Sequence, residues 1–236
     1  MSALAGPRPG IVALDRPDWP AADRLVTALG DEVDFYKVGL ELFASEGPGV
    51  VRELRGRGKR VFLDLKLHDI PNTVAGAARA ASRLGADLIT VHAAGGPEMV
   101  RAAAEAARET GGRTMILAVT VLTSLSAERL PAHFRRDVPL TELVVGLAEE
   151  ALRAGAGGLV CAGSEVGALR ARVGESPLLV VPGTRPAGAA HGDQARVVTP
   201  EAALEAGAHY LVVGRAVTEA ADPRAAWQAF WQGAHA

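Results

Sequence analysis

Short apolar segments recur along the chain, and segments of helical composition lie between them. The apolar segments cover residues 11–14, 35–38, 61–65, 88–91, 115–119, 159–162, 178–181 and 210–213. Each is rich in Val, Ile or Leu, which is typical of parallel strands that are buried on both faces. Residues 74–84, 98–109, 140–153, 164–173 and 200–205 have helical composition. The pattern predicts eight strands that alternate with helices.

Glycines stand at several junctions between a predicted helix and the next strand. Gly85, Gly155 and Gly207 occupy such junctions, where a left-handed residue commonly ends a helix. Repeated strand–helix alternation predicts an α/β fold, a single (β/α)8 barrel of the TIM type. The alternative, an open doubly wound sheet, is expected to carry Gly-x-Gly-x-x-Gly after its first strand, and this chain has no such motif there. We expect a loose N-terminal tail over residues 1–10 and one domain over residues 11–236.

Composition narrows the class of protein. The chain has 236 residues, 49% of them hydrophobic, which suits one barrel with a sizeable core. A net charge of −2 without a basic run argues against nucleic-acid and membrane-surface partners. No apolar segment is long enough for a membrane span, and the N-terminus lacks the core of a signal peptide. The lone cysteine, Cys161, lies in an apolar segment and is predicted to be buried. We therefore expect a cytoplasmic protein.

Polar residues gather where the predicted strands end, which is the functional face of such barrels. They are Asp15 after the first strand, Lys37 in the second, Asp64, Lys66 and Asp69 in and after the third, His92 after the fourth, Thr120, Thr123 and Ser124 after the fifth, Pro182, Gly183 and Arg185 after the seventh, and Gly214 and Arg215 after the eighth. We interpret His92 as a hydrogen-bonded packing residue.

The third strand carries two charges that alternation places on one face. Asp64 and Lys66 are two residues apart, so both are predicted to point into the barrel. Buried charges must be paired, and a structural ion pair is one interpretation. However, only three of the 25 basic residues are lysines, and Arg would serve a structural pair equally well. Lysine can release a proton, which favours a chemical role for Lys66. Lys59, at the opposite rim, is predicted to be a solvated charge.

The segment after the third strand has two interpretations. Asn72 or Thr73 either caps the following helix or contacts a ligand, and the two roles are compatible. Further along, the loops after the seventh and eighth strands are a common phosphate site in these barrels. Arg185 lies between glycines, and Arg215 follows Gly214. They are either phosphate ligands or surface charges.

The motif Asp64-x-Lys66-x-x-Asp69-Ile70-Pro71-Asn72-Thr73 resembles the signature of the orotidine 5'-phosphate decarboxylases. The resemblance extends over nearly the whole chain and includes residues 13–15, 36–39, 119–124, 182–186, 192–194 and 213–215. It implies conversion of orotidine 5'-monophosphate to UMP and CO2 in de novo pyrimidine biosynthesis. It also implies that no cofactor or metal is used, and that a homodimer shares its active sites.

The resemblance also implies roles for individual residues. Lys37, Asp64, Lys66 and Asp69 form a charged network, in which Lys66 stabilises the C6 carbanion and donates the proton, and Asp69 enters the partner subunit's site. The substrate ligands are Asp15 and Lys37 for the ribose, assisted by Thr73 from the other subunit, Thr123 and Pro182 for the base, and Arg185, Gln194, Gly214 and Arg215 for the phosphate.

Two other functions compete with this interpretation. A related sugar-phosphate decarboxylase or synthase would need a divalent metal, and we would expect a carboxylate ligand at the end of the second strand. Lys37 at that place disfavours it. The other alternative is a catalytically silent barrel that senses a phosphate ligand, against which the full set of charged rim residues argues.

Overall fold

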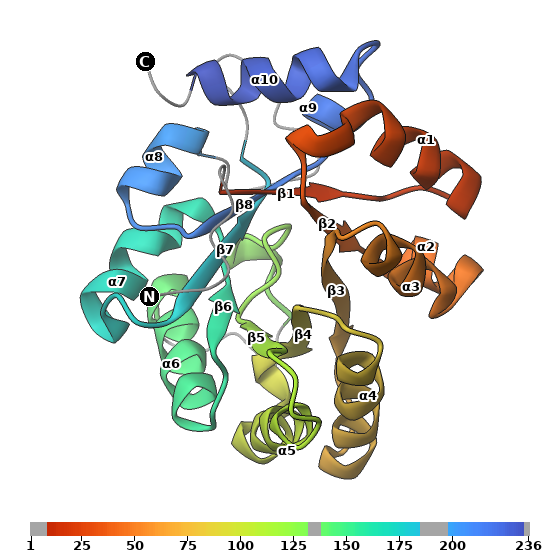
Figure 1. Cartoon of the computed structure of the whole chain (residues 1–236). Helices are drawn as coiled ribbons and strands as arrows, with labels where there is room; N and C mark the ends of the chain where they lie inside the picture. The colour runs from red at the N-terminus through yellow and green to blue at the C-terminus, as the bar shows by residue number, and fades with distance from the viewer. Residues whose placement is uncertain (1–8, 132–137, 185–197, 234–236) are drawn as a thin grey trace.

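Eight parallel strands close into a barrel in the order β1 to β8 (Figure 1). The computed structural model describes residues 9–131, 138–184 and 198–233. The strands are β1 (Gly10–Ala13), β2 (Phe35–Val38), β3 (Arg60–Leu67), β4 (Leu88–His92), β5 (Met115–Val119), β6 (Gly158–Val160), β7 (Leu178–Pro182) and β8 (Tyr210–Val213). β1 pairs with both β2 and β8, which closes the barrel. The predicted (β/α)8 barrel is confirmed and the open sheet is excluded.

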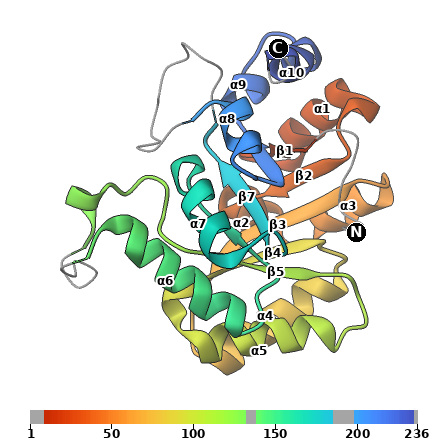
Figure 2. The ribbon, with the colours of Figure 1, turned by 90° about the vertical axis from the view of Figure 1, so that its left-hand side faces the viewer.

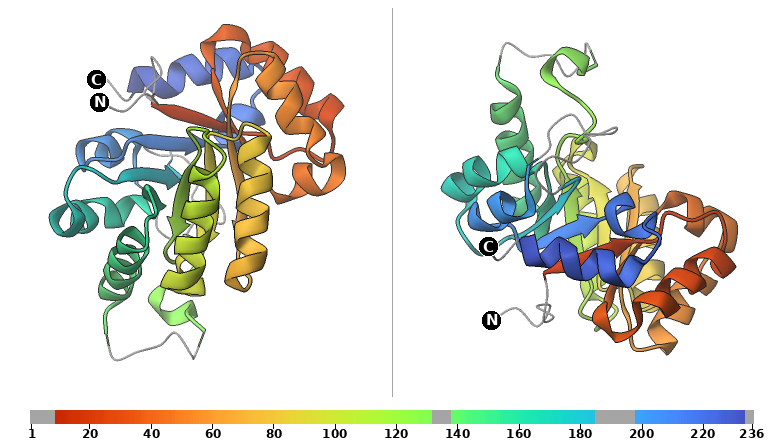
Figure 3. Two further views of the ribbon diagram at one scale, coloured as in Figure 1. Left: turned by 60° about the horizontal axis from the view of Figure 1, so that its bottom comes forward. Right: turned by 90° about the horizontal axis from the view of Figure 1, so that it is seen from above.

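The helices form an outer ring around the strands (Figures 2 and 3). They are α1 (Trp19–Leu29), α2 (Leu40–Glu46), α3 (Gly49–Gly56), α4 (Pro71–Arg83), α5 (Pro97–Arg108), α6 (Leu140–Arg153), α7 (Val166–Val173), α8 (Pro200–Glu205), α9 (Arg215–Thr218) and α10 (Pro223–Gly233). The α4 and α5 helices run side by side, and α10 lies against α1 and α9. No helix in the described ranges is long and apolar enough to cross a membrane.

Predicted and observed elements differ mainly at their ends. The helices predicted at 140–153 and 200–205 have those bounds in the structure. The helix predicted at 74–84 begins earlier, because Pro71 occupies its first turn, where a missing N–H costs nothing. The junction glycines Gly85, Gly155 and Gly207 have φ angles of 88°, 105° and 105°, as the helix-ending role requires.

Alternation along the strands produces two apolar layers. Side chains of one parity, such as Ile11, Phe35 and Phe62, fill the barrel interior. Those of the other parity, such as Val12 and Leu63, pack under the helices. Cys161 is fully buried in this outer layer, as expected. The parity matters for function, because it also fixes which polar side chains at the strand ends face inward.

The amino-terminal end of the barrel is closed by aromatic and charged side chains. The rings of Phe35 and Tyr210 meet edge to face, with centroids 5.5 Å apart. The Arg60 guanidinium lies 3.9 Å from the Phe35 ring centroid and donates a 2.9 Å hydrogen bond to the Tyr210 hydroxyl. These side chains fill the amino-terminal end of the described barrel, and the pocket described below opens at the opposite end.

Lys59 does not have the solvated position predicted for it. Its Nζ donates to the carbonyls of Gly30 at 2.8 Å and Val33 at 3.0 Å, and it lies 3.6 Å from Asp31. Its side chain is only 12% exposed. The prediction was wrong because the turn after α1 brings carbonyls to the start of β3, and these bind the ammonium in place of water.

The tail predicted over residues 1–10 is too long. Gly10 already belongs to β1, and the Pro9 carbonyl accepts a hydrogen bond from the Leu211 amide. A Cβ at Gly10 would collide with the rings of Trp227 and Trp231 on α10, so the chain is held tightly at this point. Residues 1–8 lie outside the described ranges.

Candidate active site

A pocket of about 480 Å³ opens at the carboxyl ends of the strands. Most of the predicted site residues line it, namely Asp15, Lys37, Asp64, Lys66, Thr123, Pro182, Gly214 and Arg215. Inward-facing apolar residues, including Phe62 and Val160, form its floor. The pocket thus combines an apolar floor with charged walls, which suits a small ligand that has both apolar and charged parts.

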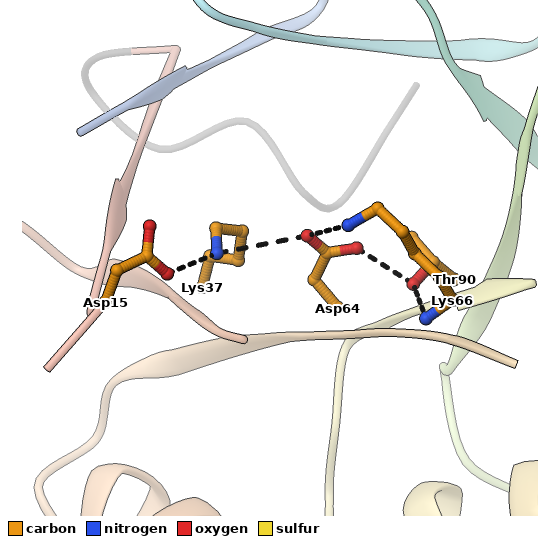
Figure 4. Close-up of polar contacts among 5 residues, drawn as sticks. All are labelled: Asp15, Lys37, Asp64, Lys66 and Thr90. Carbon is orange, nitrogen blue, oxygen red and sulfur yellow. Dashed lines mark hydrogen bonds and ion pairs between the residues drawn. The ribbon is translucent and has the colours of Figure 1, made fainter. Parts of the chain in front are cut away.

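Charges of alternating sign cross three neighbouring strands on one wall of the pocket (Figure 4). The Lys37 ammonium lies 2.8 Å from Asp15 Oδ1 and 3.9 Å from Asp64 Oδ2. Asp64 Oδ2 also accepts a 2.8 Å hydrogen bond from Lys66 Nζ. Each charge therefore has an opposite neighbour, which offsets part of the cost of removing it from water.

Exposure differs along this row of charges. The side chains of Lys37 and Asp64 are each 11% exposed, whereas Lys66 is 30% exposed and Asp15 is 61% exposed. Asp64 is thus enclosed between two ammonium groups, while Lys66 and Asp15 reach into the pocket. The most accessible cation of the row is Lys66, whose charge is oriented by a nearly buried carboxylate.

The backbone of β3 departs from regular strand geometry at Lys66. Leu63 pairs with Ile89, and the next pair is Leu67 with Val91, so the register shifts between them. Lys66 has a φ of 50°, and in the described ranges no other residue except glycine has a positive φ. Such strain costs about 1–3 kcal/mol and clusters at functional sites. Alternation placed Lys66 beside Asp64 correctly, although the strand between them is not regular.

Thr90 joins the charged row, and sequence reasoning missed it. Its hydroxyl accepts a 2.8 Å hydrogen bond from the Lys66 amide and donates to Asp64 Oδ1 at 3.0 Å. One signal was available: Thr90 is polar, and it shares the parity of Leu88, which faces the barrel interior. In an apolar strand, however, a threonine is ordinarily interpreted as a β-branched packing residue.

Asp69 and Thr73 lie away from the pocket wall in this chain. Both are exposed, and Asp69 Oδ1 accepts a 2.6 Å hydrogen bond from the Ile70 amide. Of the two interpretations of Asn72 and Thr73, capping does not occur, because Ile70 holds the cap position of α4 without a side-chain bond. Their side chains are therefore exposed at the rim beside Ile70, which is 66% exposed.

Another wall of the pocket is formed by the ends of β7 and β8, and β8 is the neighbour of β1. Pro182 ends β7, Gly183 follows with a φ of 79°, and Gly214 precedes α9. Arg215, the first residue of α9, is exposed and lines the pocket. The predicted phosphate ligands Arg185 and Gln194 lie outside the described residues.

Arg16 is a second residue that sequence reasoning missed. It lines the pocket directly after Asp15, and its Nη2 donates to the carbonyl of Thr218 at the end of α9. The contact joins the first and last parts of the barrel, which the sequence alone could not bring together. Arg16 thereby ties the loop that carries Asp15 to the helix that begins with Arg215.

His92 packs against a second imidazole next to the charged row. The rings of His92 and His68 have centroids 5.4 Å apart. Burial lowers the pKa of His92 below its ordinary value, and the neighbouring His68 and Lys66 lower it further. The ring contact with His68 agrees with the packing role predicted for His92. Among the described residues, no three His, Cys, Asp or Glu side chains cluster in a way that could hold a metal ion.

Comparison with known proteins gives one consistent family. Residues 9–230 match the family described as orotidine 5'-phosphate decarboxylase / HUMPS. Orotidine 5'-phosphate decarboxylase of Anaeromyxobacter dehalogenans is 58% identical over 221 residues, which cover 94% of this chain and 96% of that protein. The Thermobifida fusca enzyme of the same name is 55% identical over 219 residues, or 92% of each chain. The crystal structure of the Lactobacillus acidophilus decarboxylase superposes with a TM-score of 0.84 at 40% identity, covering 97% of this chain and 100% of that one.

Proposed function

This chain belongs to the orotidine 5'-phosphate decarboxylase family, and we propose that its barrel-top pocket converts orotidine 5'-monophosphate to UMP and CO2. It is a carboxy-lyase of pyrimidine biosynthesis that works without a cofactor. The observation that carries this conclusion is the row Asp15–Lys37–Asp64–Lys66, which places an oriented ammonium in a pocket with an apolar floor.

The difficulty of the reaction lies in the carbanion that loss of CO2 leaves at C6 of the pyrimidine. Its electron pair lies in the ring plane and is not delocalised, so the site must supply a compensating charge. An ammonium that is already held in place does this without reorganisation. Lys66 is the proposed group: Asp64 Oδ2 fixes its Nζ at 2.8 Å, and its 30% exposure leaves it accessible from the pocket. Lys66 then gives its proton to C6, which completes UMP.

The remaining pocket residues are assigned to the rest of the nucleotide. Asp15 and Lys37 hold the ribose hydroxyls, and their 2.8 Å contact supports a shared role. Thr123 and Pro182, which also line the pocket, are assigned to the base. The phosphate is assigned to Gly214 and Arg215 at the end of β8, together with Arg185 and Gln194. Phosphate binding far from C6 contributes to the rate, because binding energy there helps to hold the reacting ring against Lys66.

The shared site of a homodimer is also part of the proposal. Asp69 and Thr73 would act in the partner subunit's pocket, which fits their exposed positions at the rim of their own barrel. Leu40 and Ile70, at the starts of the segments that follow β2 and β3, are 61% and 66% exposed. A second copy of the chain packed against this rim would cover both side chains.

Location and other partners follow from the same proposal. The nucleotide and a second copy of the chain are the expected partners, with no nucleic acid and no membrane, and the expected place of action is the cytoplasm. The net charge of −2 and the single buried cysteine support this assignment.

Lys37 distinguishes this proposal from a metal-dependent sugar-phosphate enzyme. At the end of β2, where a carboxylate ligand would be needed, the chain presents an ammonium that is bound to two carboxylates. A silent phosphate sensor would have no need for the Lys66–Asp64 pair or for strain at Lys66. The relatives named above are all orotidine 5'-phosphate decarboxylases.

A turnover assay tests the proposal. Purified protein is given orotidine 5'-monophosphate, and released CO2 and UMP are quantified with and without EDTA. We expect rapid turnover that EDTA does not change. Turnover that EDTA abolishes and Mg2+ restores would instead indicate the metal-dependent alternative, and binding of the nucleotide without turnover would indicate the sensor.

A further inference from the structure

One buried hydroxyl connects the backbone of the proposed proton donor to the carboxylate that holds its ammonium. Thr90 on β4 is fully buried, and its Oγ1 lies 2.8 Å from the Lys66 amide nitrogen and 3.0 Å from Asp64 Oδ1 (Figure 4). We infer that Thr90 is a positioning residue that aims the Lys66 ammonium at C6 of the substrate. This inference rests on the proposed decarboxylation.

The register between β3 and β4 explains why a side chain is needed here. Leu63 pairs with Ile89 and Leu67 with Val91, so residues 64–66 face Thr90 alone. Extra residues in one strand of a pair leave some backbone N–H and C=O groups without a hydrogen-bond partner in the neighbouring strand. The Lys66 amide is such a group, and the Thr90 hydroxyl accepts its hydrogen bond in place of a backbone carbonyl. Thr90 thus supports the one point where β3 adopts a positive φ.

The chemistry of a hydroxyl fixes the direction of this connection. A threonine hydroxyl has one proton to donate and lone pairs to accept with. The Lys66 amide can only donate, so Thr90 accepts from it, and its own proton is free for Asp64 Oδ1. The one hydroxyl satisfies both polar neighbours at once. The hydroxyl therefore links the positions of the Lys66 backbone and the Asp64 carboxylate.

Asp64 consequently has each oxygen held by a different group. Oδ1 accepts from the neutral Thr90 hydroxyl, and Oδ2 faces the ammonium groups of Lys66 at 2.8 Å and Lys37 at 3.9 Å. Without Thr90, the carboxylate could rotate about its last bond and present either oxygen to the lysines. The Lys66 ammonium would follow that movement, because Asp64 is its hydrogen-bond partner. Small displacements of a reacting group are costly, at about 10²-fold in rate for an error near 1 Å.

Two matched pairs of side chains test the role of the hydroxyl. In the first pair, wild type and Thr90→Val have side chains of nearly the same shape, but only the wild type has the hydroxyl. In the second pair, Thr90→Ser and Thr90→Ala both lack the methyl group, and only Thr90→Ser has the hydroxyl. Thr114→Val serves as a control, because Thr114 donates to the Ala86 carbonyl and accepts from Ser82 at the other end of the barrel. Turnover of orotidine 5'-monophosphate, the affinity for UMP and the melting temperature are measured for every variant.

We expect Thr90→Val and Thr90→Ala to lose about 10²-fold in kcat while KM and the affinity for UMP stay within about threefold of wild type. Thr90→Ser is expected to retain most of the wild-type kcat. The Thr114→Val control is expected to lower the melting temperature without changing kcat. A purely structural hydroxyl predicts a different result, in which activity falls only as far as the folded fraction falls.

Three outcomes would overturn the inference. The first is a Thr90→Val or Thr90→Ala protein that is folded and has nearly wild-type kcat. The second is a Thr90→Ser protein that is folded and as slow as Thr90→Ala. The third is failure of both hydroxyl-free variants to fold while Thr90→Ser is active, because the hydroxyl would then support the fold and not the aim of Lys66. Failure of the wild-type chain to decarboxylate the nucleotide would instead refute the proposed function, so the two failures are distinguishable.

Discussion

Replacement of Arg16 by methionine would remove the contact between the two sides of the pocket and keep much of the side-chain volume. Arg16 follows Asp15 on the ribose side, and its guanidinium donates to the Thr218 carbonyl at the end of α9. The α9 helix spans only Arg215–Thr218, and so short a helix is not stable by itself. Its position therefore depends on contacts such as this one.

The size of the effect follows from the kind of bond that is lost. A hydrogen bond from a charged donor contributes about 1.5–3 kcal/mol, and Arg16 is only half-buried, so the lower end applies. About 1.4 kcal/mol corresponds to a tenfold change in affinity. If α9 leaves its place in most molecules, the apparent affinity for the phosphate equals the intrinsic affinity multiplied by the fraction of molecules in which α9 is still in place. We therefore expect Arg16→Met to raise KM for orotidine 5'-monophosphate by about tenfold, with kcat changed by less than about threefold.

Two substrates and one control variant separate this role from general destabilisation. The nucleoside orotidine lacks the phosphate, so its slow turnover should be nearly the same in wild type and Arg16→Met. Arg55 also donates to a backbone carbonyl, that of Lys59, but far from the pocket. Arg55→Met should lower the melting temperature and leave both KM values unchanged. Equal damage to the nucleotide and nucleoside reactions, or an unchanged KM for the nucleotide, would show that Arg16 does not act through the phosphate wall.

Two further predictions concern the dimer and the response to acid. Mixing inactive Asp69→Ala with inactive Lys66→Ala should restore part of the activity, because one site of a mixed dimer then carries neither substitution. If the subunits exchange and the activity stays at zero, Asp69 acts in the site of its own chain. Burial and Arg170 lower the pKa of His209 below its ordinary 6.5. As the pH drops, this histidine is therefore protonated at a higher pH in the unfolded chain than in the folded one. The free energy of unfolding falls as pH drops below about 6.5. His209→Asn should weaken this dependence in urea unfolding between about pH 7.5 and 5, and an unchanged slope would contradict the assignment.

Much of the fold and of the charged row could be predicted from residue type and parity. Runs of Val, Ile and Leu identified the strands, because parallel strands buried on both faces have few polar positions. Asp15, Lys37 and Asp64 have the parity of Ile11, Phe35 and Phe62, whose side chains fill the barrel. A barrel brings the carboxyl ends of its strands to one rim, so these charges had to meet there.

The supporting residues could not be predicted in this way. The hydroxyl of Thr90 has a role only because β3 shifts its register against β4, and neither strand encodes that shift alone. Lys59 is enclosed by carbonyls from a turn that is about thirty residues away along the chain. Arg16 and Thr218 lie at opposite ends of the sequence and meet only when β1 pairs with β8. Each depends on contacts between distant elements, which composition and periodicity do not report.

The central claim is that the Lys66 ammonium, held by Asp64, delivers the proton to C6. Its most direct test is the turnover of orotidine 5'-monophosphate by Lys66→Arg, measured together with its melting temperature. Arginine keeps the charge and can pair with Asp64, but it does not readily give up a proton, and its planar group is wider. We predict a protein that folds with nearly the wild-type melting temperature and loses turnover by about 10³-fold or more, as Lys66→Ala does. A well-folded Lys66→Arg enzyme with good activity would contradict the claim and would indicate that Lys66 and Asp64 form a structural ion pair.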